Sequence, residues 1–218
     1  MPVERVAVER WKSFDQAIMK HLAKVYDFAL EANNGKRLLK AVPHIRGPKV
    51  LEVSVGVGFL ISQYADKYEV TGVDYNPRCV ELTRRRLERM NKTATLMEGD
   101  AHALPFPDAS FDTVINTDAF SLYLDPDKAL QEALRVLVPG GRMILMEYDY
   151  PKDHNVLGTI CTAGIRNILR MAYFDFRSMV KNTGYPSQDH AVGLFGSLHM
   201  FIIDKPVQAQ PARAQANA

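Results

Sequence analysis

The N-terminal part of the chain has the periodicity of an amphipathic helix. From about Val3 to Val42, large apolar residues recur at spacings of three and four positions, which is the repeat of one helix face. These residues are Trp11, Phe14, Ile18, Leu22, Val25 and Ala29. Asn33, Asn34 and Gly35 then interrupt the pattern, as residues that favour turns do. The pattern predicts a helical N-terminal region.

Beyond this region, short apolar runs alternate with segments of helical periodicity. The apolar runs are typical of buried parallel strands and cover Lys49–Val55, Tyr68–Val73, Ala94–Glu98, Thr113–Asn116 and Arg142–Glu147. The helical segments cover Phe59–Ala65, Pro77–Met90 and Asp127–Val136. A Pro-Gly-Gly turn at 139–141 precedes the fifth run. Alternation of this kind predicts an open, doubly wound parallel sheet.

The last third of the chain breaks the alternation. Val156–Met171 and Phe174–Asn182 both have helical periodicity and follow one another directly. Two apolar runs come next, Asp189–Phe195 and Leu198–Ile203, with only a Gly-Ser pair between them. So short a link predicts an antiparallel hairpin, because a parallel return needs a crossover of about a dozen residues. The expected fold is α/β: a Rossmann-like, doubly wound, seven-stranded mixed sheet with an antiparallel C-terminal hairpin strand and an N-terminal helical cap.

Length and local composition divide the chain into three expected parts. Its 218 residues suit one domain with modest additions. Residues 1–45 are expected to form the helical cap and residues 46–205 the main domain. Residues 206–218 are rich in Pro, Ala and Gln and hold too few large apolar side chains to offset the entropy of ordering. We expect this last segment to be a disordered tail.

Composition narrows the range of partners. With 47% hydrophobic and 24% charged residues the chain is typical of globular proteins, and its net charge of +2 is too small to indicate a nucleic-acid partner. No apolar stretch approaches the roughly 20 residues of a membrane span, so a soluble protein is expected. Cys79 and Cys161 have neither disulfide nor zinc-ligand spacing, so a reducing, cytoplasmic location is expected. His190 and His199 lie on the two hairpin runs and lack a clear third ligand, so no metal is expected.

The strongest chemical signal lies where the first strand ends. Glu52 is followed by a turn containing Gly56 and Gly58, which lets the backbone pass close to a ligand and opens a helix whose amides favour anionic groups. Asp74 closes the second strand, where a carboxylate can accept both hydroxyls of a ribose. The dinucleotide fingerprint G-x-G-x-x-G is not met, because Leu60 and Ile61 follow in the chain after Gly58 and there is no third glycine. The pattern therefore indicates a nucleoside-like ligand and argues against NAD.

Asp100 adds a third carboxylate just past the third strand, at the same sheet edge, where it can accept from an adenine amino group. With this residue the chain resembles the class I S-adenosylmethionine-dependent methyltransferases, in the branch similar to the ubiquinone/menaquinone-biosynthesis C-methyltransferases. The resemblance runs from about Tyr26 to Pro206. It rests on the segments VLEVSVGVG, VTGVDYNP, EGDAHALPFPDASFDTV, ALRVLVPGGRMIL and IIDKP. It implies S-adenosyl-L-methionine as the cofactor and methyl transfer as the activity.

The resemblance also implies roles for individual residues at the cofactor site. The turn with Ser54, Gly56 and Gly58 contacts the methionine part, Asp74 holds the ribose, and Asn116 lies beside the methionine tail. The full set implied to bind the cofactor is Tyr26, Glu52, Ser54, Gly56, Gly58, Asp74, Tyr75, Asp100, Ala101 and Asn116. The family usually has glycine at the position of Ser54, so weakened binding or altered chemistry on a retained fold stays open.

Methyl transfer from a sulfonium needs alignment more than a catalytic side chain, but a phenol, enol or protonated amine acceptor also needs a base. The side chains expected near the carboxyl edge of the sheet are Asp118, Tyr123, Glu147, Tyr148, Asp149 and His154. Of these, Asp118, Tyr123 and Tyr148 are the predicted catalytic residues. Each has a structural alternative: Asp118 as a helix cap, Tyr123 as a core aromatic, and Tyr148 at a solvated strand end.

The expected acceptor is small and hydrophobic or amphiphilic, because the two helices after the fifth strand supply an apolar roof. The N-terminal helix combines basic residues with Trp11 and either covers the active site or contacts an anionic membrane surface. Two alternatives remain. One is phosphatidylethanolamine N-methylation at the membrane surface, with a lipid acceptor as partner. The other is a non-catalytic S-adenosylmethionine-binding protein.

Overall fold

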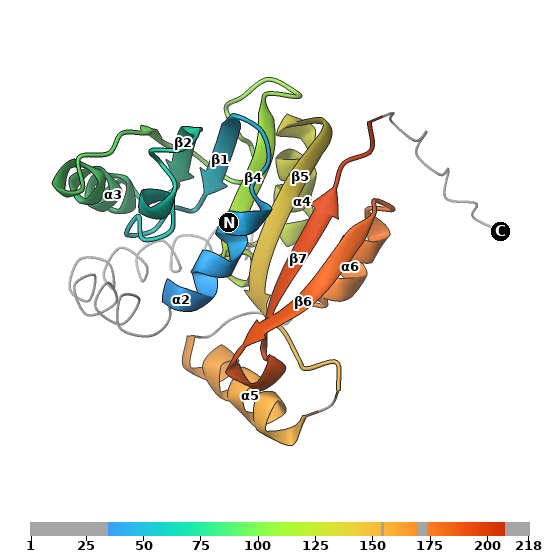
Figure 1. Cartoon of the computed structure of the whole chain (residues 1–218). Coiled ribbons are helices and arrows are strands. Elements are labelled where there is room, and N and C mark those ends of the chain that lie inside the picture. The colour runs from blue at the N-terminus through green and yellow to red at the C-terminus, as the bar shows by residue number, and fades with distance from the viewer. Residues whose placement is uncertain (1–34, 154, 170–173, 208–218) are drawn as a thin grey trace, which may run out of the picture.

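The computed structural model describes residues 35–153, 155–169 and 174–207, and it contains one seven-stranded sheet (Figure 1). The strands are β1 (Lys49–Val53), β2 (Glu69–Asp74), β3 (Thr95–Glu98), β4 (Phe111–Thr117), β5 (Leu137–Tyr148), β6 (Ser187–Gly193) and β7 (Leu198–Asp204). Their order in the sheet is β3-β2-β1-β4-β5-β7-β6. The chain reverses direction across the sheet between β1 and β4, and ligands of open α/β sheets bind at such a switch point.

The predicted mixed sheet is confirmed. The first five strands pair in parallel, whereas β7 is antiparallel to both β5 and β6. The hairpin link is longer than the sequence suggested, because β6 ends at Gly193 and β7 begins at Leu198. A 3-10 turn at Leu194–Gly196 fills the gap, with Phe195 and Gly196 in left-handed conformations (φ 54° and 82°).

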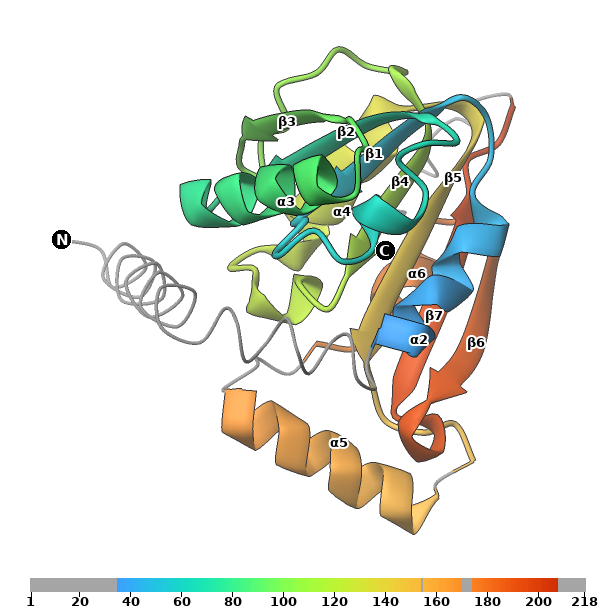
Figure 2. The same ribbon diagram turned by 60° about the vertical axis from the view of Figure 1, so that its left-hand side comes forward.

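Helices cover both faces of the sheet (Figure 2). They are α2 (Gly35–Leu38), α3 (Pro77–Arg89), α4 (Pro126–Val136), α5 (Val156–Leu169) and α6 (Phe176–Asn182). One core joins α2 and α3 to the sheet through residues such as Leu38, Leu87 and Ile144, and the other joins α4 and α6 through Leu130 and Phe176. Helix α5 lies apart from these layers, beyond the carboxyl end of β5 (Figure 2). No helix among the described residues has the length and hydropathy needed to cross a membrane.

Two sequence predictions about local structure were wrong. The helix expected at Phe59–Ala65 is reduced to a 3-10 turn at Ile61–Gln63, where the Ser62 hydroxyl donates to the Phe59 carbonyl oxygen at 2.7 Å and competes with the backbone. The Pro-Gly-Gly segment at 139–141 was expected to be a turn before the fifth strand, but it lies inside β5. Leu137 pairs with Phe111 and Arg142 with Thr113, so the register with β4 shifts there and residues 138–141 bulge out of the ladder. Gly140 N donates to Lys205 O, and Lys205 N donates to Gly141 O.

Of the predicted N-terminal cap, the structure describes only its C-terminal end: α2 and a 3-10 segment, Leu39–His44. The amphipathic stretch with Trp11, and Tyr26, lie outside the described residues. The domain boundaries at 45 and 205, and the character of the tail, therefore stay predictions.

Gly58 shows how tightly the first turn is packed onto α3. Its φ is +75°, and a Cβ there would lie 2.8 Å from Thr83 Cα. We expect Gly58→Ala to lower the free energy of unfolding by about 2–3 kcal/mol, from left-handed strain plus overlap with a backbone that cannot move aside. Gly56→Ala is the matched control, because φ is +55° there but a Cβ meets no atom within 4 Å. Urea unfolding that gives the same loss for both variants would contradict the packing argument.

Candidate functional site

The turn after β1 lies at the switch point and keeps a glycine-like backbone at its first position. Ser54 has φ 62°, in the left-handed region that glycine adopts without strain and other residues at a cost of about 1 kcal/mol. Its amide donates to Val73 O at 2.7 Å, which fixes the turn against β2. Gly56 also has a positive φ, and the space where its Cβ would lie is open. The turn thus presents bare backbone to open space at the carboxyl edge of the sheet.

Asp74 at the end of β2 holds this turn in place. It is 8% exposed, its Oδ2 accepts from Gly56 N at 2.8 Å, and its Oδ1 accepts from Asn76 N at 2.9 Å. Beneath the turn, Glu52 is 2% exposed and accepts from the Tyr64 hydroxyl at 2.5 Å. Burial raises the pKa of Glu52 to about 8, against the opposing effect of that hydrogen bond. Glu52 is therefore a protonated support of the turn at neutral pH.

A second polar chain links the turn to β4. The Tyr123 hydroxyl lies 2.6 Å from Ser54 Oγ and accepts from Asn116 Nδ2 at 2.8 Å, and the same Nδ2 donates to Val53 O at 3.0 Å. Because the Val53 carbonyl oxygen can only accept, these contacts identify which side-chain atom of Asn116 is the amide nitrogen. Asn116 is fully buried, and its Oδ1 has no hydrogen-bond partner. The edge thus contains a buried acceptor that a ligand donor can satisfy.

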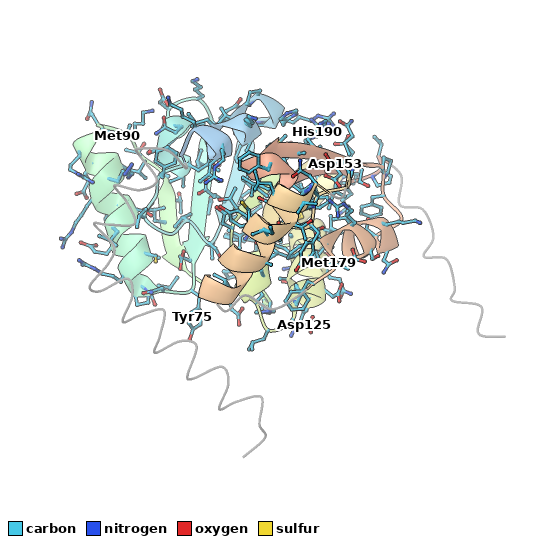
Figure 3. The ribbon with its side chains drawn as sticks, turned by 90° about the horizontal axis from the view of Figure 1, so that it is seen from below. Tyr75, Met90, Asp125, Asp153, Met179 and His190 are labelled. Carbon is cyan, nitrogen blue, oxygen red and sulfur yellow. The ribbon has the colours of Figure 1, made fainter. Side chains whose placement is uncertain are left out.

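The third carboxylate, Asp100, lies beyond β3 and is engaged by His102. Asp100 Oδ1 lies 2.6 Å from His102 Nδ1, and the His102 ring meets Tyr123 edge-on at a centroid distance of 5.4 Å. His102, which the sequence analysis left aside, is thereby packed against the site. Ala101 is buried, whereas Tyr75 is 42% exposed and points outward at the rim (Figure 3).

A charged cluster occupies the neighbouring part of the edge, where β4 and β5 end. Asp118 has φ 55°, and its Oδ1 is withdrawn from solvent without a hydrogen-bond partner. Burial raises the pKa of Asp118 to about 6, and the nearby Arg37 opposes that shift. Glu147 accepts from Phe120 N and from the Ser121 hydroxyl, and burial together with Asp118 raises its pKa to about 8. The structure thus brings the predicted Asp118 and Tyr148 together with Glu147 and with Arg37, which sequence reasoning missed.

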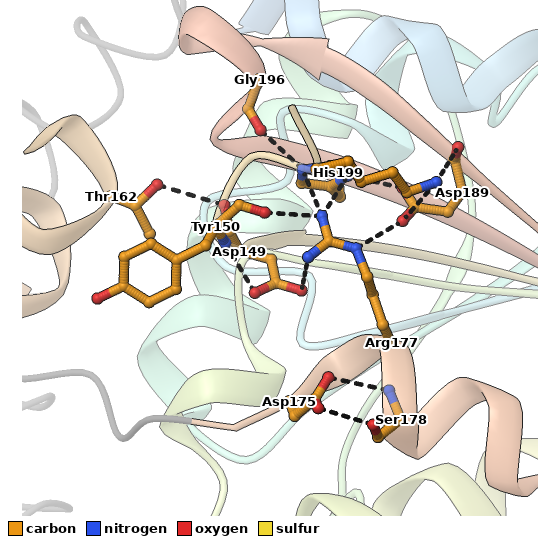
Figure 4. Close-up of polar contacts among 10 residues, drawn as sticks. Asp149, Tyr150, Thr162, Asp175, Arg177, Ser178, Asp189, Gly196 and His199 are labelled. Atoms are coloured by element: carbon orange, nitrogen blue, oxygen red, sulfur yellow. Dashed lines mark hydrogen bonds and ion pairs between the residues drawn. The ribbon is translucent and has the colours of Figure 1, made fainter. Parts of the chain in front are cut away.

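A partly buried ion-pair network lies just beyond the carboxyl end of β5 (Figure 4). Arg177 of α6 pairs with Asp149 at 3.3 Å and with Asp189 at 3.0 Å, and Asp189 also lies 2.6 Å from His199 Nδ1. Burial acts to raise the pKa of Asp189, but its hydrogen bonds with His199 and Lys152 lower it to about 2. Asp149, one of the residues expected near the edge, thus belongs to this structural network.

The two hairpin histidines are separated by the sheet. His190 is exposed and stacks on His44 at a centroid distance of 6.0 Å, while His199 is buried on the face that carries α6. In the described part of the chain, no group of three or more His, Cys, Asp or Glu side chains is placed to hold a metal ion. His154 lies outside the described residues.

Comparison with known proteins accounts for this geometry. A family model described as "Methyltransferase domain" matches residues 51–145. A phosphatidylethanolamine N-methyltransferase of Cereibacter sphaeroides is 30% identical over 140 residues, which cover 62% of this chain and 68% of that protein. The chain belongs to the class I S-adenosylmethionine-dependent methyltransferases. The predicted family is confirmed, and several of the relatives are named as demethylmenaquinone or ubiquinone/menaquinone biosynthesis methyltransferases.

Among these methyltransferases, the demethylmenaquinone methyltransferase of Thermus thermophilus is 37% identical over 110 residues, and that of Thermotoga maritima is 30% identical over 152 residues. The matches cover 49% and 67% of this chain. The chain spans 50% and 65% of the length of those two relatives. A solved methyltransferase of Thermotoga maritima, described as a possible histamine N-methyltransferase, covers 87% of this chain with a TM-score of 0.69 at 20% identity, and 99% of that chain is matched. This likeness confirms the Rossmann-like fold.

The residues at the carboxyl edge fit the cofactor on which this family depends, S-adenosylmethionine. Open space faces the backbone of Gly56, where an amino acid moiety can approach. The unpartnered Oδ1 of Asn116 suits an ammonium donor, and Asp74 lies at the strand end that serves ribose hydroxyls in such sheets. Ser54 does not disturb the turn, because its backbone retains the left-handed conformation and its hydroxyl is held by Tyr123.

Proposed function

We propose that the protein transfers a methyl group from S-adenosylmethionine to a small hydrophobic or amphiphilic acceptor. The observation that carries the proposal is the buried Asn116 Oδ1, an acceptor without a partner beside a turn of bare backbone. Ser54, Gly56 and Gly58 shape the part of the site for the methionine moiety, with Glu52 beneath them. Asp74 binds the ribose, and Tyr75, Asp100 and Ala101 surround the adenine. Tyr26 is proposed to close over the cofactor.

The cofactor supplies an electrophilic methyl group, and the protein supplies alignment and exclusion of water. Well-oriented reactants gain roughly 7–11 kcal/mol over the bimolecular reaction in water. The Ser54–Tyr123–Asn116 chain of hydrogen bonds makes the site rigid where that alignment is needed. Burial raises the pKa of Tyr123 further above its ordinary range, so this hydroxyl remains protonated and serves as a link rather than as a base.

Apolar side chains beyond the carboxyl edge support a hydrophobic acceptor. Val156 and Ile160 on α5 are 73% and 62% exposed, and Phe195 in the neighbouring turn is 58% exposed. Curated relatives named demethylmenaquinone methyltransferase point to the same class of acceptor. A hydroquinone with an apolar substituent fits both the apolar side chains near the edge and the names of these relatives.

The test is to incubate purified protein with methyl-labelled S-adenosylmethionine and a metabolite extract, and to partition the label among lipid, aqueous and macromolecular fractions. Calorimetry with S-adenosylhomocysteine measures binding of the cofactor product separately. We expect tight binding and label in the organic-soluble fraction. Label found only in macromolecules would contradict a small acceptor, and absence of binding would contradict the proposed function as a whole.

A second candidate function is phosphatidylethanolamine N-methylation, which the relative from Cereibacter sphaeroides favours. Vesicles with and without phosphatidylethanolamine separate this reaction from transfer to a hydroquinone, and vesicle pelleting with and without residues 1–24 tests membrane contact. The non-catalytic alternative rested on Ser54. Ser54 fits the turn without disturbing it, which weakens the case for a non-catalytic protein. Binding of S-adenosylmethionine without turnover on any extract would support that alternative again.

A further inference from the structure

We propose that Asp118 removes a proton from a hydroxyl group of the acceptor and that the Arg37 guanidinium stabilises the oxyanion left behind. This inference rests on the proposed methyltransferase function and narrows its acceptor to phenols, hydroquinones and enols. It selects one base from the several side chains near the edge and adds Arg37, a residue outside the sequence segments that carry the family resemblance.

The backbone places Asp118 at the edge in an unusual conformation. It directly follows β4, its amide donates to Met146 O at 2.9 Å, and its φ is 55°. Asp and Asn are the non-glycine residues that tolerate this region best, but they still adopt it at a cost. The strained conformation holds the carboxyl group at the end of β4, two residues beyond Asn116 and its unpartnered acceptor.

The Asp118 carboxyl group has an oxygen ready to receive a proton. The residue is partly exposed, yet its Oδ1 is buried and has no hydrogen-bond partner. Buried polar atoms without partners are rare in proteins, because each costs about 1–3 kcal/mol. A hydroxyl group of a bound acceptor would satisfy this oxygen and would lie in position to transfer its proton.

The charges around Asp118 leave it as the one group of this cluster able to act as a base near neutral pH. Arg37 faces it from α2, and Glu147 and Tyr148 face it from β5. Burial raises the pKa of Glu147 to about 8 and that of Tyr148 to about 12, so both hold their protons. The pKa of Asp118, raised by burial to about 6, leaves it ionised at neutral pH and a stronger base than an ordinary aspartate.

Arg37 lies close enough to Asp118 for its positive charge to stabilise the acceptor oxyanion once Asp118 has taken the proton. Its side chain lies in the gap left by Gly193, where an added Cβ would come within 2.7 Å of Arg37 Cδ. From there it attracts Asp118 and hydrogen-bonds Tyr148. Once Asp118 is neutral, the positive charge of Arg37 acts on the new oxyanion. An ammonium acceptor such as a phospholipid amine gains nothing from this charge.

The reaction balances without any further reactant. The acceptor O–H bond breaks, its proton moves to Asp118 Oδ1, and the electron pair stays on oxygen or is delocalised to the adjacent ring carbon. That oxygen or carbon forms the bond to the methyl group, and the electrons of the broken S–CH₃ bond remain on sulfur, giving S-adenosylhomocysteine. When carbon is methylated, its hydrogen returns to the oxygen as a proton. Asp118 then releases its own proton to solvent.

The experiment measures methyl transfer from labelled S-adenosylmethionine to 1,4-naphthohydroquinone, under anaerobic conditions and as a function of pH. In the wild type we expect kcat to rise with pH through about 6. Asp118→Asn keeps a residue that tolerates positive φ, so it should fold. It should lower kcat by about 100-fold and remove the dependence near pH 6, with little change in KM or in binding of S-adenosylhomocysteine.

Arg37 variants give a readout that a structural role would not produce. Because Arg37 lowers the pKa of Asp118, Arg37→Met should move the rise in kcat to higher pH, and Arg37→Lys should largely restore it. Asp127→Asn, an exposed carboxylate on α4, is the matched control and should behave as wild type.

Several outcomes would overturn the inference. One is an Asp118→Asn protein with the wild-type rate and pH profile. Another is a wild-type protein that binds S-adenosylhomocysteine but transfers no label to 1,4-naphthohydroquinone, or transfers it only to phosphatidylethanolamine vesicles. A wild-type protein that binds no S-adenosylhomocysteine would instead refute the underlying methyltransferase function.

Discussion

Asp74→Ala is expected to abolish measurable binding of S-adenosylhomocysteine, with a loss of affinity of about 1,000-fold or more. The carboxylate has two functions in the proposed site. It anchors the turn through Gly56 N and Asn76 N, and it accepts the ribose hydroxyls. Hydrogen bonds to a charged group contribute about 1.5–3 kcal/mol each, and each tenfold change in affinity corresponds to about 1.4 kcal/mol. Loss of two ligand bonds and of the turn anchor therefore accounts for three powers of ten.

Calorimetric titration of the folded variant checks this result. Asp66→Ala is the matched control, because Asp66 is exposed, pairs with Lys92 and lies away from the edge, so its variant should bind as wild type. Thermal unfolding confirms that both variants are folded. Wild-type affinity in folded Asp74→Ala would show that the ribose does not lie at the end of β2.

The fold was predictable where a local pattern determines an element. Alternating apolar runs and helical segments correctly indicated the parallel strands, and the short link before β7 indicated the antiparallel hairpin. The errors occurred where tertiary contacts override local sequence. The Gly140–Gly141 segment looks like a turn before the strand, but it is a bulge within β5 that two backbone hydrogen bonds link to Lys205. No local pattern shows that link, because Lys205 lies more than sixty residues away in the chain.

The candidate site was predictable in its carboxylates but not in their charge states. Asp74 ends one strand, Asp100 and Asp118 come shortly after two others, and the parallel sheet brings all three to one edge. Burial decides which of the neighbouring carboxyl groups is protonated, and burial depends on the assembled core. Arg37 could not be predicted, because a four-residue helix outside every motif carries it to Asp118. The left-handed backbone of Ser54, which reconciles serine with a glycine position, became apparent only from φ.

Glu52→Gln is expected to make the protein more stable at pH 8 by about 3–5 kcal/mol and to leave its stability near pH 5 almost unchanged. Glu52 is buried in β1, and burial raises its pKa to about 8 from the ordinary value of 4.5. At a pH between 4.5 and about 8, Glu52 of the folded protein holds a proton that the unfolded chain has released. The free energy of unfolding therefore falls as pH rises through this window, by about 1.4 kcal/mol for each pH unit.

Glutamine removes this dependence because it carries no titrating proton, and its side-chain oxygen still accepts from the Tyr64 hydroxyl. Urea unfolding at intervals from pH 5 to pH 8 measures the difference, with Glu69→Gln as the exposed control on β2. Part of the slope should persist in Glu52→Gln, because Glu147 is also buried with a pKa raised to about 8. Parallel stability curves for wild type and Glu52→Gln would mean that Glu52 is ionised in the folded protein. An ionised Glu52 would place a negative charge beneath the proposed methionine site. Such a charge would attract the ammonium group of the methionine moiety, whereas the protonated Glu52 inferred above only supports the turn.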